Sequence, residues 1–287
     1  MFRLAIFCIV WNAAAQTTLL EEANAHYRAL RSEEAVRAYR EYLSRNPDRA
    51  DVRVFLGGAL LNLDRWQEAA AEAAAALKLD PEYGKAYVLL GRIGIARQDW
   101  SAAEQDFSRA MTLHPEDRET WYFAGRAAYE ENHFDSAVER FERALALGAT
   151  ESRVYENLGL ALEAAARFQD AEKAYRKALD RAEGAWRPYL AYGRFLFKQG
   201  RTKDSLEPLA EAFRLQPADA DAKFEFGRAL YKAEDIERAI AVLTGMPATD
   251  DCRVHNLLVK IFSLKGDLRR SEKELSGLKR CAEGRPF

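Results

Sequence analysis

A small residue returns every 34 residues along most of this chain of 287 residues. The series is Gly57, Gly91, Gly125, Gly159, Gly193 and Gly227, and twelve residues after each stand Ala69, Ala103, Ala137, Ala171, Ser205 and Ala239. A fixed period of this length predicts a stack of similar supersecondary repeats, each packed on its neighbours. Such a stack provides a surface for binding and carries no chemistry by default.

Each period is typical of two helices joined by a tight turn. Apolar residues recur at helical spacing, as at Tyr155, Leu158 and Leu162. A polar turn then leads into a large apolar residue in most repeats: Trp66, Trp100, Phe134, Phe168, Ile236 and Leu268. Prolines that end helices close four repeats: Pro47, Pro81, Pro115 and Pro217. The small residues let the two helices of a repeat approach closely.

The period divides residues 16–285 into eight frames. Six frames have 34 residues, the seventh has 32 and the eighth has 34: 16–49, 50–83, 84–117, 118–151, 152–185, 186–219, 220–251 and 252–285. Residues 286–287 remain as a tail, and no room is left for another domain. Pro208 inside a second helix and an early end at residues 245–247 predict an irregular step between repeats six and eight. The alternative is a tolerated deletion without functional meaning.

These residues resemble the tetratricopeptide repeat family, which shares the period, the small positions, the large apolar residue and the closing proline. The resemblance covers all of residues 16–285. It implies an all-α, right-handed superhelical solenoid of about eight helix-turn-helix repeats, whose first helices line a concave groove that holds a peptide or another protein. The chain departs from the pattern at Ala149 and Glu183 in place of proline, at Thr202 in place of a large apolar residue, and at Val259 in place of glycine.

The first fifteen residues predict a secretory signal that is cleaved before Gln16. Arg3 supplies a positive charge, residues 4–11 are apolar and residues 13–15 are alanines. The alternative is an uncleaved anchor, but the apolar run is shorter than the roughly 20 residues that span a bilayer. We therefore expect a secreted or periplasmic protein with no membrane span after cleavage.

Cleavage would remove Cys8 and leave Cys252 and Cys281 at the two ends of the last helical hairpin. Those ends are neighbours in an antiparallel hairpin, so we expect a disulfide in an oxidising compartment. The alternative is two free thiols in a reducing compartment. A metal site is not expected, because two cysteines lack further ligands at metal-binding spacing.

Composition and motifs favour a binding protein over an enzyme. The net charge of −2 lacks the strong positive excess of nucleic-acid-binding domains. The four histidines fall in different repeats, and no phosphate loop, nucleophile elbow or zinc-binding helix motif occurs. We expect no catalytic residues and no cofactor.

The family's geometry places the second, fifth, ninth, twelfth and thirteenth residues of each frame on the concave face. In repeats one to five these places hold five cations and five acids, whereas repeats six to eight hold seven cations against Asp221 alone: Arg187, Arg194, Lys198, Arg228, Lys232, Arg253 and Lys260. Apolar and aromatic residues lie among these cations: Leu190, Phe197, Phe224 and Tyr231.

Aromatic side chains beside cations predict a binding site for an acidic or carboxylate-terminated protein segment. The predicted partner-binding residues are Arg187, Leu190, Arg194, Phe197, Lys198, Phe224, Arg228, Tyr231, Lys232 and Lys260. In the alternative interpretation the cations pair with acidic neighbours and the aromatics fill gaps between repeats. The predicted function is an exported protein-binding scaffold; the alternatives are a non-catalytic assembly subunit of an envelope secretion or polysaccharide-export complex, or a solenoid that binds an anionic polymer.

Overall fold

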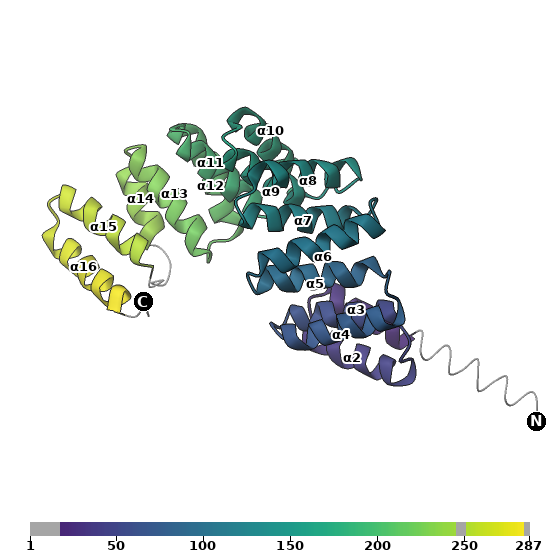
Figure 1. Cartoon of the computed structure of the whole chain (residues 1–287). Helices are drawn as coiled ribbons and strands as arrows, with labels where there is room; N and C mark the ends of the chain where they lie inside the picture. Colours follow the sequence, from purple (N-terminus) through teal and green to yellow (C-terminus); the bar gives the residue numbers. More distant parts are fainter. Residues whose placement is uncertain (1–17, 245–250, 284–287) are drawn as a thin grey trace, which may run out of the picture. The chain divides into compact units, whose positions relative to one another are not determined.

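The computed structural model describes residues 18–244 and 251–283, and all regular structure in these ranges is helical (Figure 1). The predicted signal at residues 1–15, residues 245–247 and the tail at residues 286–287 lie outside the described residues. The chain divides into an N-terminal half, Met1–Ala149, and a C-terminal half, Thr150–Phe287. None of the helices in the described ranges is long and apolar enough to cross a membrane.

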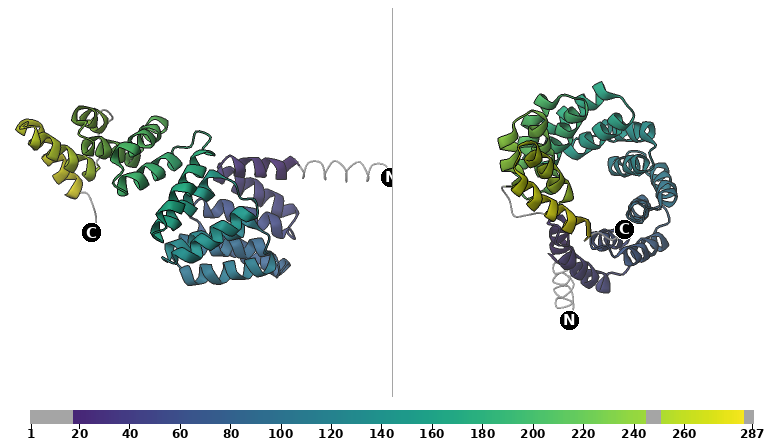
Figure 2. Two further views of the ribbon diagram at one scale, coloured as in Figure 1. Left: turned by 90° about the horizontal axis from the view of Figure 1, so that it is seen from above. Right: turned by 90° about the vertical axis from the view of Figure 1, so that its left-hand side faces the viewer.

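Each half is a stack of antiparallel helix pairs (Figures 1 and 2). The N-terminal half contains a helix at residues 18–28, followed by α2 (Ser32–Arg45), α3 (Ala50–Leu61), α4 (Trp66–Leu79), α5 (Gly84–Ala96), α6 (Trp100–Leu113), α7 (Arg118–Glu130) and α8 (Phe134–Ala146). The C-terminal half contains α9 (Ser152–Ala164), α10 (Phe168–Leu179), α11 (Arg187–Lys198), α12 (Thr202–Leu215), α13 (Ala220–Lys232), α14 (Ile236–Thr244), α15 (Cys252–Leu264) and α16 (Leu268–Glu283). The prediction of an all-α repeat solenoid is confirmed.

The turn inside each helix pair has the same backbone conformation throughout the chain. One residue per turn has a positive φ: Leu30, Asp64, Gln98, Asn132, Ala166, Gly200, Glu234 and Gly266. These residues are 34 apart up to Glu234 and then 32 apart, which repeats the spacing of the sequence frames. The following amide donates back to a carbonyl five residues earlier, as Arg167 N does to Leu162 O at 2.8 Å. This bond closes the first helix, and the left-handed residue reverses the chain.

The periodic glycines stand where a large side chain packs on the helix backbone, an aromatic ring at Gly91, Gly125 and Gly159 and a leucine at the others. A Cβ on Gly159 would lie 2.8 Å from Cδ1 of Tyr175, and a Cβ on Gly125 would lie 2.8 Å from Cε1 of Phe141. Tyr175 and Phe141 are completely buried. The period therefore arises because each repeat buries a large side chain against the bare backbone of its first helix.

Each half has its own apolar core. The N-terminal core includes Tyr39, Leu56 and Leu60, and the C-terminal core includes Leu209, Leu230 and Phe262. Burial of one such side chain stabilises the fold by about 1.5–3 kcal/mol. In the C-terminal half, α12 continues from Thr202 to Leu215 through the buried Pro208, so the proline does not end the helix.

Candidate partner-binding site

A pocket of ≈ 360 Å³ lies across the first helices of the last three repeats, α11, α13 and α15. We call the residues that line it the C-terminal pocket: Phe197, Phe224, Arg228, Tyr231, Lys232, Arg253, Asn256, Leu257 and Lys260. Six of the ten predicted partner-binding residues are among them. The structure therefore brings these six residues to one site.

Arginine and phenylalanine side chains alternate along one wall of the C-terminal pocket. The guanidinium carbon of Arg228 lies 4.3 Å from the ring centre of Phe197 and 5.6 Å from that of Phe224. The guanidinium carbon of Arg253 lies 4.8 Å from the ring centre of Phe224. We call Phe197, Arg228, Phe224 and Arg253 the arginine–phenylalanine ladder. Cation–π attraction holds its members in a fixed order across three helices.

A buried carboxylate lies behind the ladder. Glu225 is 8% exposed, and its carboxylate accepts a hydrogen bond from Nε of Arg194 at 3.2 Å. Its other oxygen lies 2.5 Å from Nη2 of Arg228. A buried carboxylate needs such partners, because its desolvation would otherwise be costly. Arg194 and Arg228 are therefore already neutralised by the protein.

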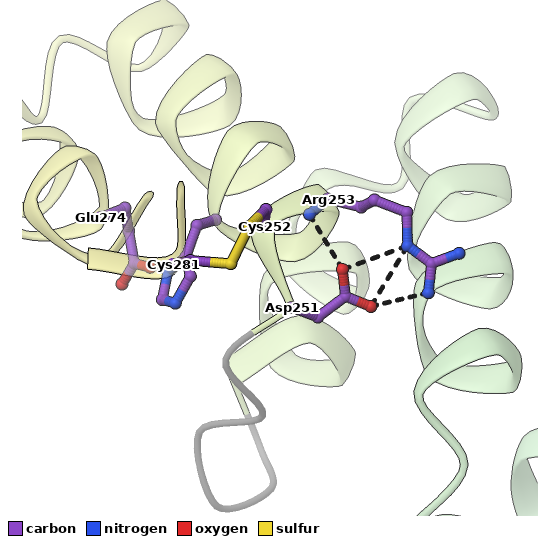
Figure 3. The surroundings of a disulfide bond; sticks show 6 residues. Asp251, Cys252, Arg253, Glu274 and Cys281 are labelled. Atoms are coloured by element: carbon purple, nitrogen blue, oxygen red, sulfur yellow. Dashed lines mark hydrogen bonds and ion pairs between the residues drawn. A yellow bond between two sulfur atoms is a disulfide. The ribbon is translucent and has the colours of Figure 1, made fainter. Parts of the chain in front are cut away.

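Two further carboxylates hold the end of the ladder. Nη2 of Arg253 donates to Asp221 at 2.7 Å and to Asp251 at 2.7 Å, and Arg194 lies 3.0 Å from Asp221 (Figure 3, Asp251 and Arg253). Burial acts to raise the pKa of Asp221, but hydrogen bonds from Arg253 and Arg194 outweigh it and hold the pKa below its usual value. For Arg194, Arg228 and Arg253, the alternative interpretation of pairing with acidic neighbours describes the structure.

Two lysines of the C-terminal pocket differ from these arginines in their pairing with carboxylates. Lys232 and Lys260 are exposed, and across residues 18–244 and 251–283 neither ammonium group has a carboxylate within ion-pair distance. Lys198, in contrast, donates to Glu163 at 2.8 Å and does not line the pocket. The positive charge available to a partner at this pocket therefore belongs to Lys232 and Lys260.

The remaining predicted residues lie elsewhere. Leu190 is only 5% exposed and packs in the C-terminal core with Leu209 and Phe226, so the prediction that it faces the groove is corrected. Its side chain is buried because Leu209 of α12 and Phe226 of α13 belong to the same core cluster. Arg187 begins α11, where its guanidinium carbon lies 5.6 Å from the ring centre of Trp186 and outside the pocket.

Sequence reasoning missed Glu225 and Asp251, which neutralise the arginines of the ladder. Their local spacing was a usable signal: Glu225 stands three residues before Arg228, and Asp251 two residues before Arg253. It also missed Leu257, and Asn256, an uncharged residue at a concave place.

Cys252 and Cys281 meet in a disulfide, with Cα atoms 5.6 Å apart (Figure 3). Cys252 begins α15 and Cys281 lies near the end of α16, as expected for an antiparallel hairpin. Nδ1 of His255 lies 2.7 Å from Glu274, which makes a second link between the two helices. The described part of the chain has no group of three or more histidine, cysteine or acidic side chains placed to hold a metal.

Family comparison assigns the chain to a class. A tetratricopeptide repeat model matches residues 20–84, 59–118 and 122–185, and a second tetratricopeptide repeat model matches residues 196–261. The chain belongs to the tetratricopeptide repeat family. A search of curated proteins finds no match to it.

Solved structures of low sequence identity share its fold. A chain of the APC/C hetero-tetramer Cut9–Hcn1 superposes with a TM-score of 0.68 at 16% identity, over 93% of this chain and 53% of that chain, so this chain spans about half its length. The pilF protein of Pseudomonas aeruginosa superposes with a TM-score of 0.61 at 19% identity, over 77% of this chain and 98% of pilF. YrrB is described as a tetratricopeptide repeat protein with an unusual peptide-binding site. It superposes with a TM-score of 0.50 at 19% identity, over 66% of this chain and 97% of YrrB.

Proposed function

We propose that this chain is an exported, non-catalytic scaffold that binds an acidic or carboxylate-terminated segment of a partner protein in the C-terminal pocket. Tetratricopeptide repeat proteins bind other proteins or peptides, and YrrB is described by its peptide-binding site. The observation that carries the proposal is the pair Lys232 and Lys260, two unpaired cations beside phenylalanine and tyrosine side chains. Such a combination suits a carboxylate that is attached to an apolar group.

The proposed export is supported by two features of the sequence. Residues 1–15 have the pattern of a secretory signal, and the pair Cys252 and Cys281 suits an oxidising compartment. Cell fractionation and N-terminal sequencing of the exported protein test this part. Recovery of the intact chain from the cytoplasm alone would contradict it.

Binding is tested by titrating an acidic peptide and its carboxamide analogue against the chain. The Lys232→Ala/Lys260→Ala variant should bind the acidic peptide at least 10-fold more weakly, because both unpaired cations are gone. A Lys203→Ala/Lys279→Ala variant removes two exposed lysines outside the pocket and should bind as the unmodified chain does. Equal affinity of all three proteins, or equal binding of the two peptides, would refute the proposal.

The same titration distinguishes a protein partner from the alternative partner, an anionic polymer. A polysaccharide with carboxylate groups should compete with the peptide if the pocket accepts any anionic chain. We expect weak competition, because the apolar wall of the pocket would remain unfilled by a sugar polymer. Strong competition would favour the polymer as the partner.

A further inference from the structure

The face of α15 that lines the C-terminal pocket carries three different polar groups in a row. Arg253, Asn256 and Lys260 are spaced i, i+3 and i+7, so they lie along one side of the helix. At 1.5 Å per residue, Arg253 and Lys260 are about 10 Å apart along the axis. This stripe gives the pocket two distinct ends.

The Arg253 end is not a free cation. Its Nε donates to Asp251, its Nη2 donates to Asp221 and Asp251, and it lies over Phe224 as the last member of the ladder. Its side chain is nevertheless 43% exposed. Since hydrogen bonds occupy Nε and Nη2 and Phe224 covers one face, the parts of the guanidinium left for a partner are Nη1 and the opposite face. That face is a place for another ring, which would continue the alternation of Phe197, Arg228 and Phe224.

The Lys260 end has the opposite character. Lys260 and Lys232 are exposed cations, unlike the neutralised Arg253. A carboxylate would therefore bind at this end, since compact ammonium groups without partners attract it most strongly. Asn256 lies between the two ends and can donate to or accept from the backbone of a bound peptide.

We infer that the C-terminal pocket recognises a partner segment in which an aromatic residue and a carboxylate are three residues apart. The aromatic ring stacks on the exposed face of Arg253, and the carboxylate binds Lys260 and Lys232. The spacing follows because an extended peptide advances about 3.3 Å per residue, so three residues cover the distance of about 10 Å. This inference rests on the proposed function and defines its ligand.

The test uses peptides of equal charge in a neutral serine and glycine host. One pair has Phe-Ser-Ser-Glu and Glu-Ser-Ser-Phe, the second has Ala in place of Phe, and the third has Phe next to Glu. We expect at least one member of the first pair to bind about 3- to 10-fold more tightly than its counterparts, the range of one cation–π contact.

An Arg253→Lys variant isolates the stacking. Lysine keeps the positive charge beside Asp221 and Asp251 but lacks the flat face of a guanidinium. The variant loses hydrogen bonds to Asp221 and Asp251, so its melting temperature should fall, and binding is measured at a temperature where circular dichroism shows it fully helical. The readout is the ratio of the affinities for the phenylalanine and alanine peptides within each protein, and this ratio should fall to about 1 in the variant.

The outcomes are distinguishable. If acidic peptides bind but phenylalanine gives no advantage at any spacing, or if the advantage persists in Arg253→Lys, the inference is wrong and the proposed function stands. If no acidic peptide binds, the proposed function fails as well. A neutral control, Phe-Ser-Ser-Gln, completes the set, and if it binds as tightly as Phe-Ser-Ser-Glu, the assignment of the carboxylate to the two lysines is wrong.

Discussion

The guanidinium carbon of Arg228 lies 4.3 Å from the centre of the Phe197 ring, although the two residues belong to different repeats. Arg228 is held in that position from behind by Glu225, which is almost completely buried. The contact therefore links the wall of the C-terminal pocket to the packing of α11 on α13. The proposed binding surface and the repeat interface therefore share Phe197 and Arg228.

Replacement of Glu225 should weaken this interface. Glu225→Gln keeps the shape of the side chain but leaves Arg228 without its carboxylate partner and Arg194 with Asp221 alone, so we expect a loss of about 1–3 kcal/mol in the free energy of unfolding. Urea denaturation followed by circular dichroism measures this loss. Glu207→Gln, at an exposed residue of α12, is the control and should change the midpoint little. Similar midpoints for both variants would show that the buried carboxylate has no structural role.

The turn residue Ala166 offers a test of the repeat geometry. Its φ is 58°, a value that costs an L-residue free energy, so Ala166→Gly should stabilise the fold by about 0.5–1 kcal/mol. Ala165 has a φ of −77°, and Ala165→Gly should destabilise the fold because it only adds freedom to the unfolded chain. Chemical denaturation of both variants compares them. A loss of stability in Ala166→Gly would contradict the conformation assigned to the turn.

The disulfide should stabilise the last helix pair more than any other. Cys252 and Cys281 are 29 residues apart, and a cross-link over such a loop contributes about 3–4 kcal/mol in the chain-entropy model. Cys252→Ser/Cys281→Ser should therefore increase hydrogen exchange in α15 and α16 and leave α3 to α6 unchanged. Reduction with dithiothreitol should act in the same way on the unmodified chain and have no effect on the variant. Equal exchange before and after reduction would argue against a stabilising cross-link.

The raised pKa of Asp106 predicts that the stability of the N-terminal half depends on pH. Burial, with a smaller effect from Asp99, raises its pKa to about 6. The folded state therefore binds this proton more tightly than the unfolded state, so the contribution of Asp106 to stability falls as the pH rises from about 4 to about 6. A shift of about two pKa units corresponds to about 3 kcal/mol at most, and partial exposure reduces this.

Asp106→Asn should accordingly stabilise the fold at pH 7 by about 1–2 kcal/mol and lose that advantage below pH 4. Thermal melts across this range provide the measurement. Asp48→Asn, at an exposed residue, is the matched control and should behave alike at both pH values. A constant difference between Asp106→Asn and the unmodified chain would show that the carboxyl is not perturbed.

The fold could be predicted because its determinants are local and repeated. Gly159 must be small because Tyr175 packs on its backbone, and similar close contacts recur at the other periodic glycines. The candidate site could be predicted only in part. Helical spacing determines which residues lie on the concave face, so Phe224, Arg228 and Lys260 could be found from the sequence. Leu190 also stands at a position that the repeat pattern assigns to the concave face, but its side chain is buried in the C-terminal core.

The charge balance of the site could not be counted from concave places alone. Glu225 lies at a place that faces the neighbouring helix, yet its carboxylate reaches Arg194 and Arg228 on the concave side. The pair of Glu225 and Arg228 follows from local spacing, whereas the contact of Glu225 with Arg194 depends on the distance between α11 and α13, because long side chains cross the boundary between faces. Four of the seven cations are paired with carboxylates in the described part of the chain, which leaves Lys232 and Lys260 in the pocket and Arg187 outside it.

The central claim is that these two lysines bind the carboxylate of a partner segment. The most direct test is a charge exchange, in which Lys232→Glu/Lys260→Glu and the unmodified chain are each titrated with an acidic peptide and with its lysine counterpart at two salt concentrations. We predict that the unmodified chain prefers the acidic peptide, that the variant prefers the lysine peptide, and that added salt weakens both preferences. An unchanged preference for the acidic peptide in the variant would contradict the account.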